Sequence, residues 1–169
     1  MLVRGISKRS KKQIRKNLHS YGNHTINQLE NVLNKTKFLY FFDMGTLLGI
    51  VREGRIIQHD LDIDIGMHIS SENERELLLE LLKKNHCEHR YSYHIENVGV
   101  VEDSFVLNNI KFDISYYFRE KDKDVCYLMY RDPEKTRNFD YLDVIKLSCT
   151  PIIETRKMKF GDGQVTIPV

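Results

Sequence analysis

The sequence predicts an α+β fold in which helices cover a mixed, mostly antiparallel sheet. Three observations indicate this class. Two stretches have the apolar spacing of amphipathic helices, several short stretches have the alternation or the apolar run of strands, and an asparagine pair separates two of those strands as a hairpin turn would. Consecutive strands joined by short turns favour antiparallel pairing, with helices packed on the sheet.

The first elements expected along the chain are helical. Helical spacing is found over residues 10–20 and again over residues 25–36, where one apolar stripe is formed by Ile26, Leu29, Val32 and Leu33. Residues 38–42, FLYFF, have the apolar and aromatic character of a buried strand. Gly45 breaks that run, and we expect a short helix over residues 46–51 to follow.

The central strand is expected over residues 61–69, LDIDIGMHI, where apolar and polar side chains alternate. Ser71 and Glu74 have the spacing of a capping box, which predicts a leucine-rich helix over residues 72–85. Three further strands and a terminal hairpin are expected over residues 91–95, 98–107, 110–118, 157–160 and 164–167. Residues 119–140 are polar and receive no assignment.

Length and composition fit one domain with a hydrophobic core. The chain has 169 residues, of which 41% are hydrophobic and 30% charged. Three scattered cysteines are too few for a disulfide scaffold or a four-cysteine zinc site. No apolar run approaches the ~18 residues of a membrane span, and no apolar stretch follows the basic N-terminus as a secretory signal would require, so we expect a cytoplasmic protein.

The charge is unevenly distributed. The net charge is +2, yet the first 29 residues contain seven lysines and arginines and no acid. We therefore divide the chain into a basic, partly helical arm over residues 1–24 and a domain over residues 25–169. Such an arm is either a solvated charged segment or a peripheral contact with an anionic membrane or nucleic acid.

Two aspartates interrupt the apolar central strand. Asp62 and Asp64 fall on the same face of residues 61–69, about 6–7 Å apart along the strand, where two ionised carboxylates repel each other and resist burial. One interpretation is an exposed edge strand whose polar face meets water. The other is a site for Mg²⁺, which prefers oxygen ligands and shares them with substrate phosphates.

The surrounding sequence favours the metal site. Gly45 and Thr46 lie at a turn from a strand to a helix, where free N–H groups and a hydroxyl can hold a phosphate. Downstream, Asp113 lies inside another apolar strand, KFDISYYF. Three carboxylates from two strands beside such a turn suggest a two-metal site for phosphoryl transfer.

These motifs resemble the LicD family, which includes bacterial phosphocholine transferases and fukutin-related proteins. The resemblance is carried by GTLLGIVR over residues 45–52 and by DLDIDIGM over residues 60–67, and it extends more weakly over residues 38–169. It implies the nucleotidyltransferase fold, whose parts are a glycine turn, a D-x-D strand and a later carboxylate. The family often has a run of acids before the final D-I-D, whereas this chain has His59-Asp60-Leu61.

The resemblance also implies roles for individual residues. Asp62, Asp64 and Asp113 would be the catalytic carboxylates and the ligands of Mg²⁺, with Mn²⁺ as a substitute. The substrate-binding residues would be Gly45, Thr46 and Arg52, which would contact the phosphates of a nucleotide-activated donor such as a CDP-alcohol.

The implied function is transfer of a phospho-alcohol, either phosphocholine or a polyol phosphate, from the donor to a hydroxyl of a carbohydrate acceptor. One alternative is nucleotidyl transfer to a small hydroxylated acceptor. Another is a non-catalytic module that binds a nucleotide or a glycan. A glycosyltransferase is disfavoured, because its D-x-D motif is not accompanied by a Gly-Thr turn and a third carboxylate.

Overall fold

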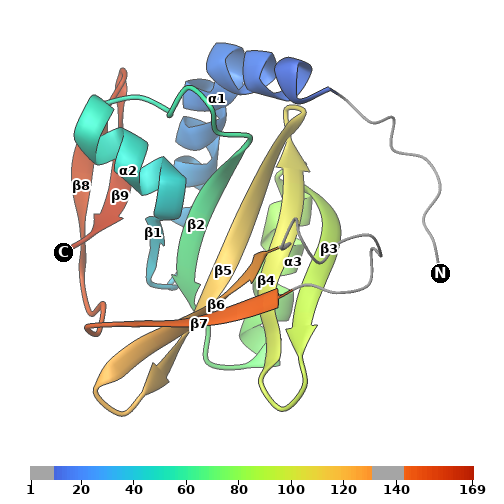
Figure 1. Ribbon diagram of the computed structural model, residues 1–169, viewed down its shortest axis with the longest axis vertical. Coiled ribbons are helices and arrows are strands. Elements are labelled where there is room, and N and C mark those ends of the chain that lie inside the picture. Colours follow the sequence, from blue (N-terminus) through green and yellow to red (C-terminus); the bar gives the residue numbers. More distant parts are fainter. Residues whose placement is uncertain (1–9, 131–142) are drawn as a thin grey trace.

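The structure, a computed structural model, describes residues 10–130 and 143–169, which form three helices and nine strands (Figure 1). Seven strands belong to one sheet, and its central path runs in the order β1 (Tyr40–Phe42), β2 (Asp62–His68), β5 (Ile110–Glu120), β4 (Gly99–Leu107) and β3 (Glu88–Ile95). Strands β2 and β5 are parallel and the other pairs are antiparallel. The predicted α+β class and mostly antiparallel sheet are confirmed.

Helix α1 (Lys11–Leu33) replaces the two separate helical stretches that the sequence predicts. It runs without a break through the expected boundary after residue 24, and Leu18 and Gly22 in its middle are buried. A Cβ atom on Gly22 would lie 2.3 Å from Cδ1 of Ile56, so glycine allows this turn of the helix to pack closely. Residues 1–9 of the expected arm lie outside the described residues.

Helices α2 (Met44–Glu53) and α3 (Glu72–Lys84) confirm two predictions and extend the first by a few residues. Helix α2 ends at Glu53 and is capped by Gly54, whose φ of 63° is the left-handed conformation that glycine adopts readily. The serine half of the predicted capping box of α3 is present, since Ser71 accepts a hydrogen bond from the backbone N–H of Glu74, while the Glu74 carboxylate accepts from the N–H of Ser70.

Strand β6 (Lys123–Tyr130) lies within residues 119–140, for which no element was predicted, and β7 (Asp143–Cys149) lies just beyond them. Strand β6 pairs with the end of β5 and with β7, so these two strands continue the sheet past its central path. In Figure 1 they cross in front of the face that α1 and α3 leave open. Residues 131–142 lie outside the described residues.

The main core lies on the helix side of the sheet. Ile63 and Ile65 of β2 are buried there, in one cluster with apolar residues of α1 and α3 such as Leu29 and Leu78. Because side chains alternate along a strand, Asp62 and Asp64 point to the opposite face, as the sequence predicts. The sheet thus separates an apolar core from a polar surface.

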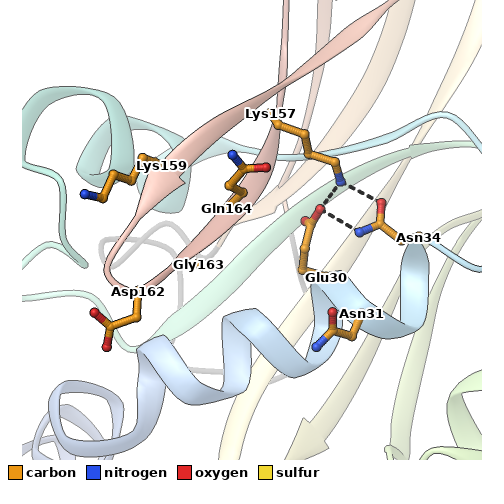
Figure 2. A pocket seen from close by; sticks show the side chains of 8 residues that line it. All are labelled: Glu30, Asn31, Asn34, Lys157, Lys159, Asp162, Gly163 and Gln164. Carbon is orange, nitrogen blue, oxygen red and sulfur yellow. Dashed lines mark hydrogen bonds and ion pairs between the residues drawn. The ribbon is translucent and has the colours of Figure 1, made fainter.

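The predicted terminal hairpin is present as β8 (Thr155–Phe160) and β9 (Gly163–Pro168). It is tied to α1 through the buried residue Glu30, whose Oε1 accepts a hydrogen bond from Asn34 at 3.0 Å and forms an ion pair with Lys157 (Figure 2). The same oxygen accepts a hydrogen bond from the hydroxyl of Thr166 at 2.8 Å. The hydroxyl of Tyr40 donates to the same oxygen at 3.1 Å. This network closes the edge of the core beside β1.

Candidate active site

Three carboxylates meet on the open face of the sheet. Asp64 of β2 and Asp113 of β5 are register partners on adjacent parallel strands, and Asp62 precedes Asp64 by two positions on the same face. Adjacent strands lie about 4.8 Å apart, so the register brings the carboxyl groups from both strands together. The structure thus gathers the three acids that the sequence analysis selects.

Lys111 lies among these acids and was missed by the sequence analysis. Its Nζ donates to Oδ2 of Asp62 at 3.1 Å and to Oδ2 of Asp113 at 2.5 Å. Burial alone would lower the pKa of Lys111, but the charges of Asp113 and Asp62 outweigh burial and raise it, so the ammonium stays charged. The spacing K-x-D places Lys111 on the same face as Asp113, and this was the available signal.

Glu102 of β4 is a fourth acid at the site and was also missed. It is buried, and it is the register partner of Ser115 on β5. Burial raises its pKa to about 7, and the negative charge of Asp113 adds to that effect. Only the alternation of β4 places Glu102 on this face, since it belongs to none of the motifs found in the sequence.

The four acids of the site carry more negative charge than the ammonium of Lys111 neutralises. Burial raises the pKa of Asp64 to about 7, with further contributions from Asp62 and Asp113. Burial also raises the pKa of Asp113, although Lys111 opposes the shift. Among the described residues of the cavity, four carboxylates therefore share one ammonium, and proton uptake near neutral pH relieves part of the repulsion.

A cavity of about 320 Å³ opens above these residues, which is within the size range of small-molecule sites. Its polar side is formed by Asp62, Asp64, Glu102, Lys111, Asp113 and Ser115. Its apolar side is formed by Met44, Tyr91, Tyr93, Leu128, Met129 and Ile145. The cavity therefore offers charge to one end of a ligand and apolar contact to the other.

The Gly-Thr turn lies at the start of α2, beside β2. The Thr46 side chain is 1% exposed, and its Oγ1 accepts a hydrogen bond at 2.9 Å from the backbone N–H of Asp64. Thr46 thus holds the D-x-D strand and does not present its hydroxyl to the cavity. At Gly45, an added Cβ would lie 3.3 Å from Oδ2 of Asp60, so the absence of a side chain makes room for that carboxylate.

Arg52 lies apart from the acids in this structure. Its side chain is 56% exposed on α2 and forms an ion pair with Glu53, and it does not line the cavity described above. Asp60 precedes β2, and its buried Oδ2 has no hydrogen-bond partner within the described ranges. Burial raises the pKa of Asp60.

The side chains of the acidic cluster have the chemistry of metal ligands, but they are not arranged around one point in this structure. Carboxylate oxygens are the ligands that Mg²⁺ prefers, and buried Oδ1 of Asp113 lacks a well-formed hydrogen bond to any described residue, although Ser104 lies opposite on β4. Across residues 10–130 and 143–169, no three His, Cys, Asp or Glu side chains are grouped as they would be around an ion. Lys111 stands between two of the candidate ligands instead.

A larger cavity of about 490 Å³ lies between α1 and the terminal hairpin (Figure 2). Its one buried acid, Glu30, already accepts hydrogen bonds from its neighbours, as described for the fold. Its remaining lining is polar and comes from Asn31, Asn34, Lys157, Lys159, Asp162, Gly163 and Gln164. The described residues that line this cavity include two acids and two lysines, so they carry no excess of charge like that around Asp64.

A D-x-D strand, a carboxylate on its parallel neighbour and a Gly-Thr turn that opens a helix define a nucleotidyltransferase-type domain. The chain belongs to the LicD family: the family model described as LicD/FKTN/FKRP, nucleotidyltransferase domain, matches residues 37–168. No curated protein matches the chain. Membership of this family indicates a transferase of the phosphotransferase type. None of the described helices has the length and apolar character needed to span a membrane.

Proposed function

We propose that the protein is a metal-dependent transferase that moves a phospho-alcohol from a CDP-type donor to a hydroxyl of a sugar or glycan. The observation that carries the proposal is the register of Asp64 and Asp113 on parallel strands, with Asp62 beside them at one cavity. The phospho-alcohol is phosphocholine or a polyol phosphate.

Asp62, Asp64 and Asp113 are the residues that would hold Mg²⁺, or Mn²⁺ in its place. When bound, the cation would neutralise negative charge on the donor phosphates. The backbone at Gly45 would contact the donor, while Thr46 would act by fixing Asp64 through the backbone. Arg52 would reach the phosphates only if its side chain left Glu53.

The attacking hydroxyl must lose a proton during transfer. Asp113 is one acceptor for that proton, as the family resemblance implies. Glu102 is a second, because it lines the same cavity and its pKa of about 7 lies near neutral pH. The apolar side of the cavity would hold a part of the donor that carries no charge.

The test is to incubate the protein with Mg²⁺, a carbohydrate acceptor and a CDP-alcohol that carries separate labels on the cytidine and on the alcohol. Alcohol label on the acceptor supports the proposal. Cytidine label on the acceptor, or transfer from labelled CTP, would instead indicate a nucleotidyltransferase. No transfer with bound donor would indicate a binding module.

Matched variants should locate the activity. Asp64→Asn should abolish transfer, whereas Asp122→Asn, which alters an exposed aspartate in the turn between β5 and β6, should leave it unchanged. Calorimetric titration with Mn²⁺ should give binding to the wild type and weaker binding to Asp62→Asn. Equal binding by both proteins would remove Asp62 from the metal site.

A further inference from the structure

Among the described residues that line the acidic cavity, Lys111 is the one basic side chain. We infer that Lys111 is an internal counter-ion that competes with a divalent cation for Asp62 and Asp113. The inference rests on the proposed metal site. On this inference Lys111 lowers the affinity of the site for the cation. A permanent structural ion pair would not respond to the cation in this way.

The contacts of Lys111 support competition. One ammonium group lies within 3.1 Å of Asp62 Oδ2 and 2.5 Å of Asp113 Oδ2, so it already occupies the space between them. A Mg²⁺ ion would lie about 2.1 Å from the same oxygens. The two cations repel each other at such distances, so each weakens the binding of the other to these oxygens.

The ammonium satisfies only part of the cluster. It contacts one oxygen of Asp113, while the buried Oδ1 of that residue has no well-formed hydrogen bond within the described parts of the chain. Asp64 and Glu102 line the same cavity, and no direct ion pair joins either of them to Lys111. The single positive charge of Lys111 therefore stabilises the cluster only in part. A divalent ion would neutralise more of the negative charge and can replace the ammonium.

Lys111 has room to move aside. Its side chain is 36% exposed at the cavity, and its four-carbon stem can carry the ammonium away from the carboxylates without a change in the backbone of β5. Asp113 is more confined, with a side chain that is 12% exposed. The lysine is thus the mobile partner in this contact and the carboxylate the fixed one.

The test compares the wild type with Lys111→Met, which keeps most of the stem and removes the charge. Mn²⁺ affinity is measured by calorimetry, and the unfolding temperature is measured with chelator and with Mn²⁺. We expect Lys111→Met to bind Mn²⁺ at least about tenfold more tightly, because no ammonium has to be displaced. We also expect it to unfold at a lower temperature in chelator and to recover with Mn²⁺.

Lys146→Met is the matched control, since Lys146, in the middle of β7, forms an exposed ion pair with Glu120 and does not line the acidic cavity. It should bind Mn²⁺ like the wild type. Should Lys111→Met fail to fold in chelator, Lys111→Gln gives a neutral side chain that can still donate to the carboxylates.

The outcomes separate the two ideas. If the wild type binds Mn²⁺ and the folded Lys111 variants bind it equally or less tightly, the competition is overturned and the proposed metal site stands. If neither the wild type nor the variants bind Mn²⁺ at millimolar concentration, both fail. Only tighter binding by the Lys111 variants supports the inference.

Discussion

The hydroxyl oxygen of Thr46 accepts a hydrogen bond at 2.9 Å from the backbone N–H of Asp64, a residue 18 positions further along the chain. The contact joins the first turn of α2 to the middle of β2. The threonine of the Gly-Thr motif thus fixes the backbone of Asp64, the residue of the D-x-D pair whose pKa is raised by burial to about 7.

Replacement of Thr46 by valine should destabilise the protein. Thr46→Val keeps the shape of the side chain but leaves the N–H of Asp64 without its acceptor, which costs about 1–3 kcal/mol for a buried donor. Thr46→Ser retains the acceptor and should cost less. Denaturant unfolding of the three proteins tests this, and equal losses for valine and serine would show that the hydroxyl makes no net contribution.

The metal-free protein should become more stable as the pH falls from about 8 to about 6. The pKa values of Asp64 and Glu102 are raised to about 7, so the folded state takes up protons at a pH where the unfolded chain does not. The cost of burying these charges is fully present well above pH 7 and is relieved as the pH falls through 7 toward the ordinary carboxyl pKa. Each group contributes about 1 kcal/mol over this interval.

The measurement is the unfolding free energy in chelator at several pH values. Asp62, Asp113 and Lys111 face the two groups, and His68, whose pKa is lowered mainly by burial, contributes in the opposite direction. The variants Asp64→Asn and Glu102→Gln therefore isolate the effect, because each should flatten the pH dependence. Variants with the same slope as the wild type would contradict the assignment.

The site was predictable as far as strand alternation and motif spacing reach. Alternation along β2 puts Asp62 and Asp64 on one face, and the apolar strand around Asp113 places it in the same sheet. The sequences of the two strands do not predict the parallel pairing that sets Asp64 opposite Asp113. That pairing depends on the crossover through α3, β3 and β4. Glu102 was missed because only that register shows it buried beside Asp113, and Lys111 was missed although its K-x-D spacing already put it on the same face as Asp113.

Two parts of the fold were missed for local reasons. Gly22 lowers helix propensity and suggests a break, yet close packing against Ile56 keeps α1 continuous. Strand β6 begins with charged residues that resemble a loop, and its pairing with β5 and β7 overrides this local preference. In both cases tertiary contacts decided the conformation.

Loss of the Glu30 carboxylate should loosen the terminal hairpin. In Glu30→Ala, the backbone N–H of Thr166, which donates to Oε2 at 3.1 Å, and the hydroxyl of Tyr40 lose a buried acceptor, which we expect to cost about 3 kcal/mol. Asn31→Ala is the matched control, because Asn31 is an exposed residue that lines the same cavity between α1 and the terminal hairpin. Amide hydrogen exchange along β9 should accelerate in Glu30→Ala alone, and unchanged protection would argue against the tether.

The glycine that follows the D-x-D motif is explained by the packing behind it. A Cβ atom on Gly66 would lie 2.3 Å from Cε2 of Phe41 and 3.0 Å from Cε2 of Tyr117, two rings that pack edge to face. The hydroxyl of Tyr117 donates to Oδ2 of Asp43 at 2.7 Å, and Asp43 caps α2. A displaced Tyr117 would therefore disturb the helix that holds β2.

We expect Gly66→Ala to destabilise the protein by about 1–3 kcal/mol, as overpacking of a buried site does. Phe41→Leu leaves space where the new methyl would point, so the double variant should lose less stability than the sum of the two single variants. Equilibrium unfolding of all four proteins gives the coupling energy between the two positions. Strict additivity would show that the ring of Phe41 does not limit the residue at position 66, and the role of this glycine would then have to lie in the backbone itself.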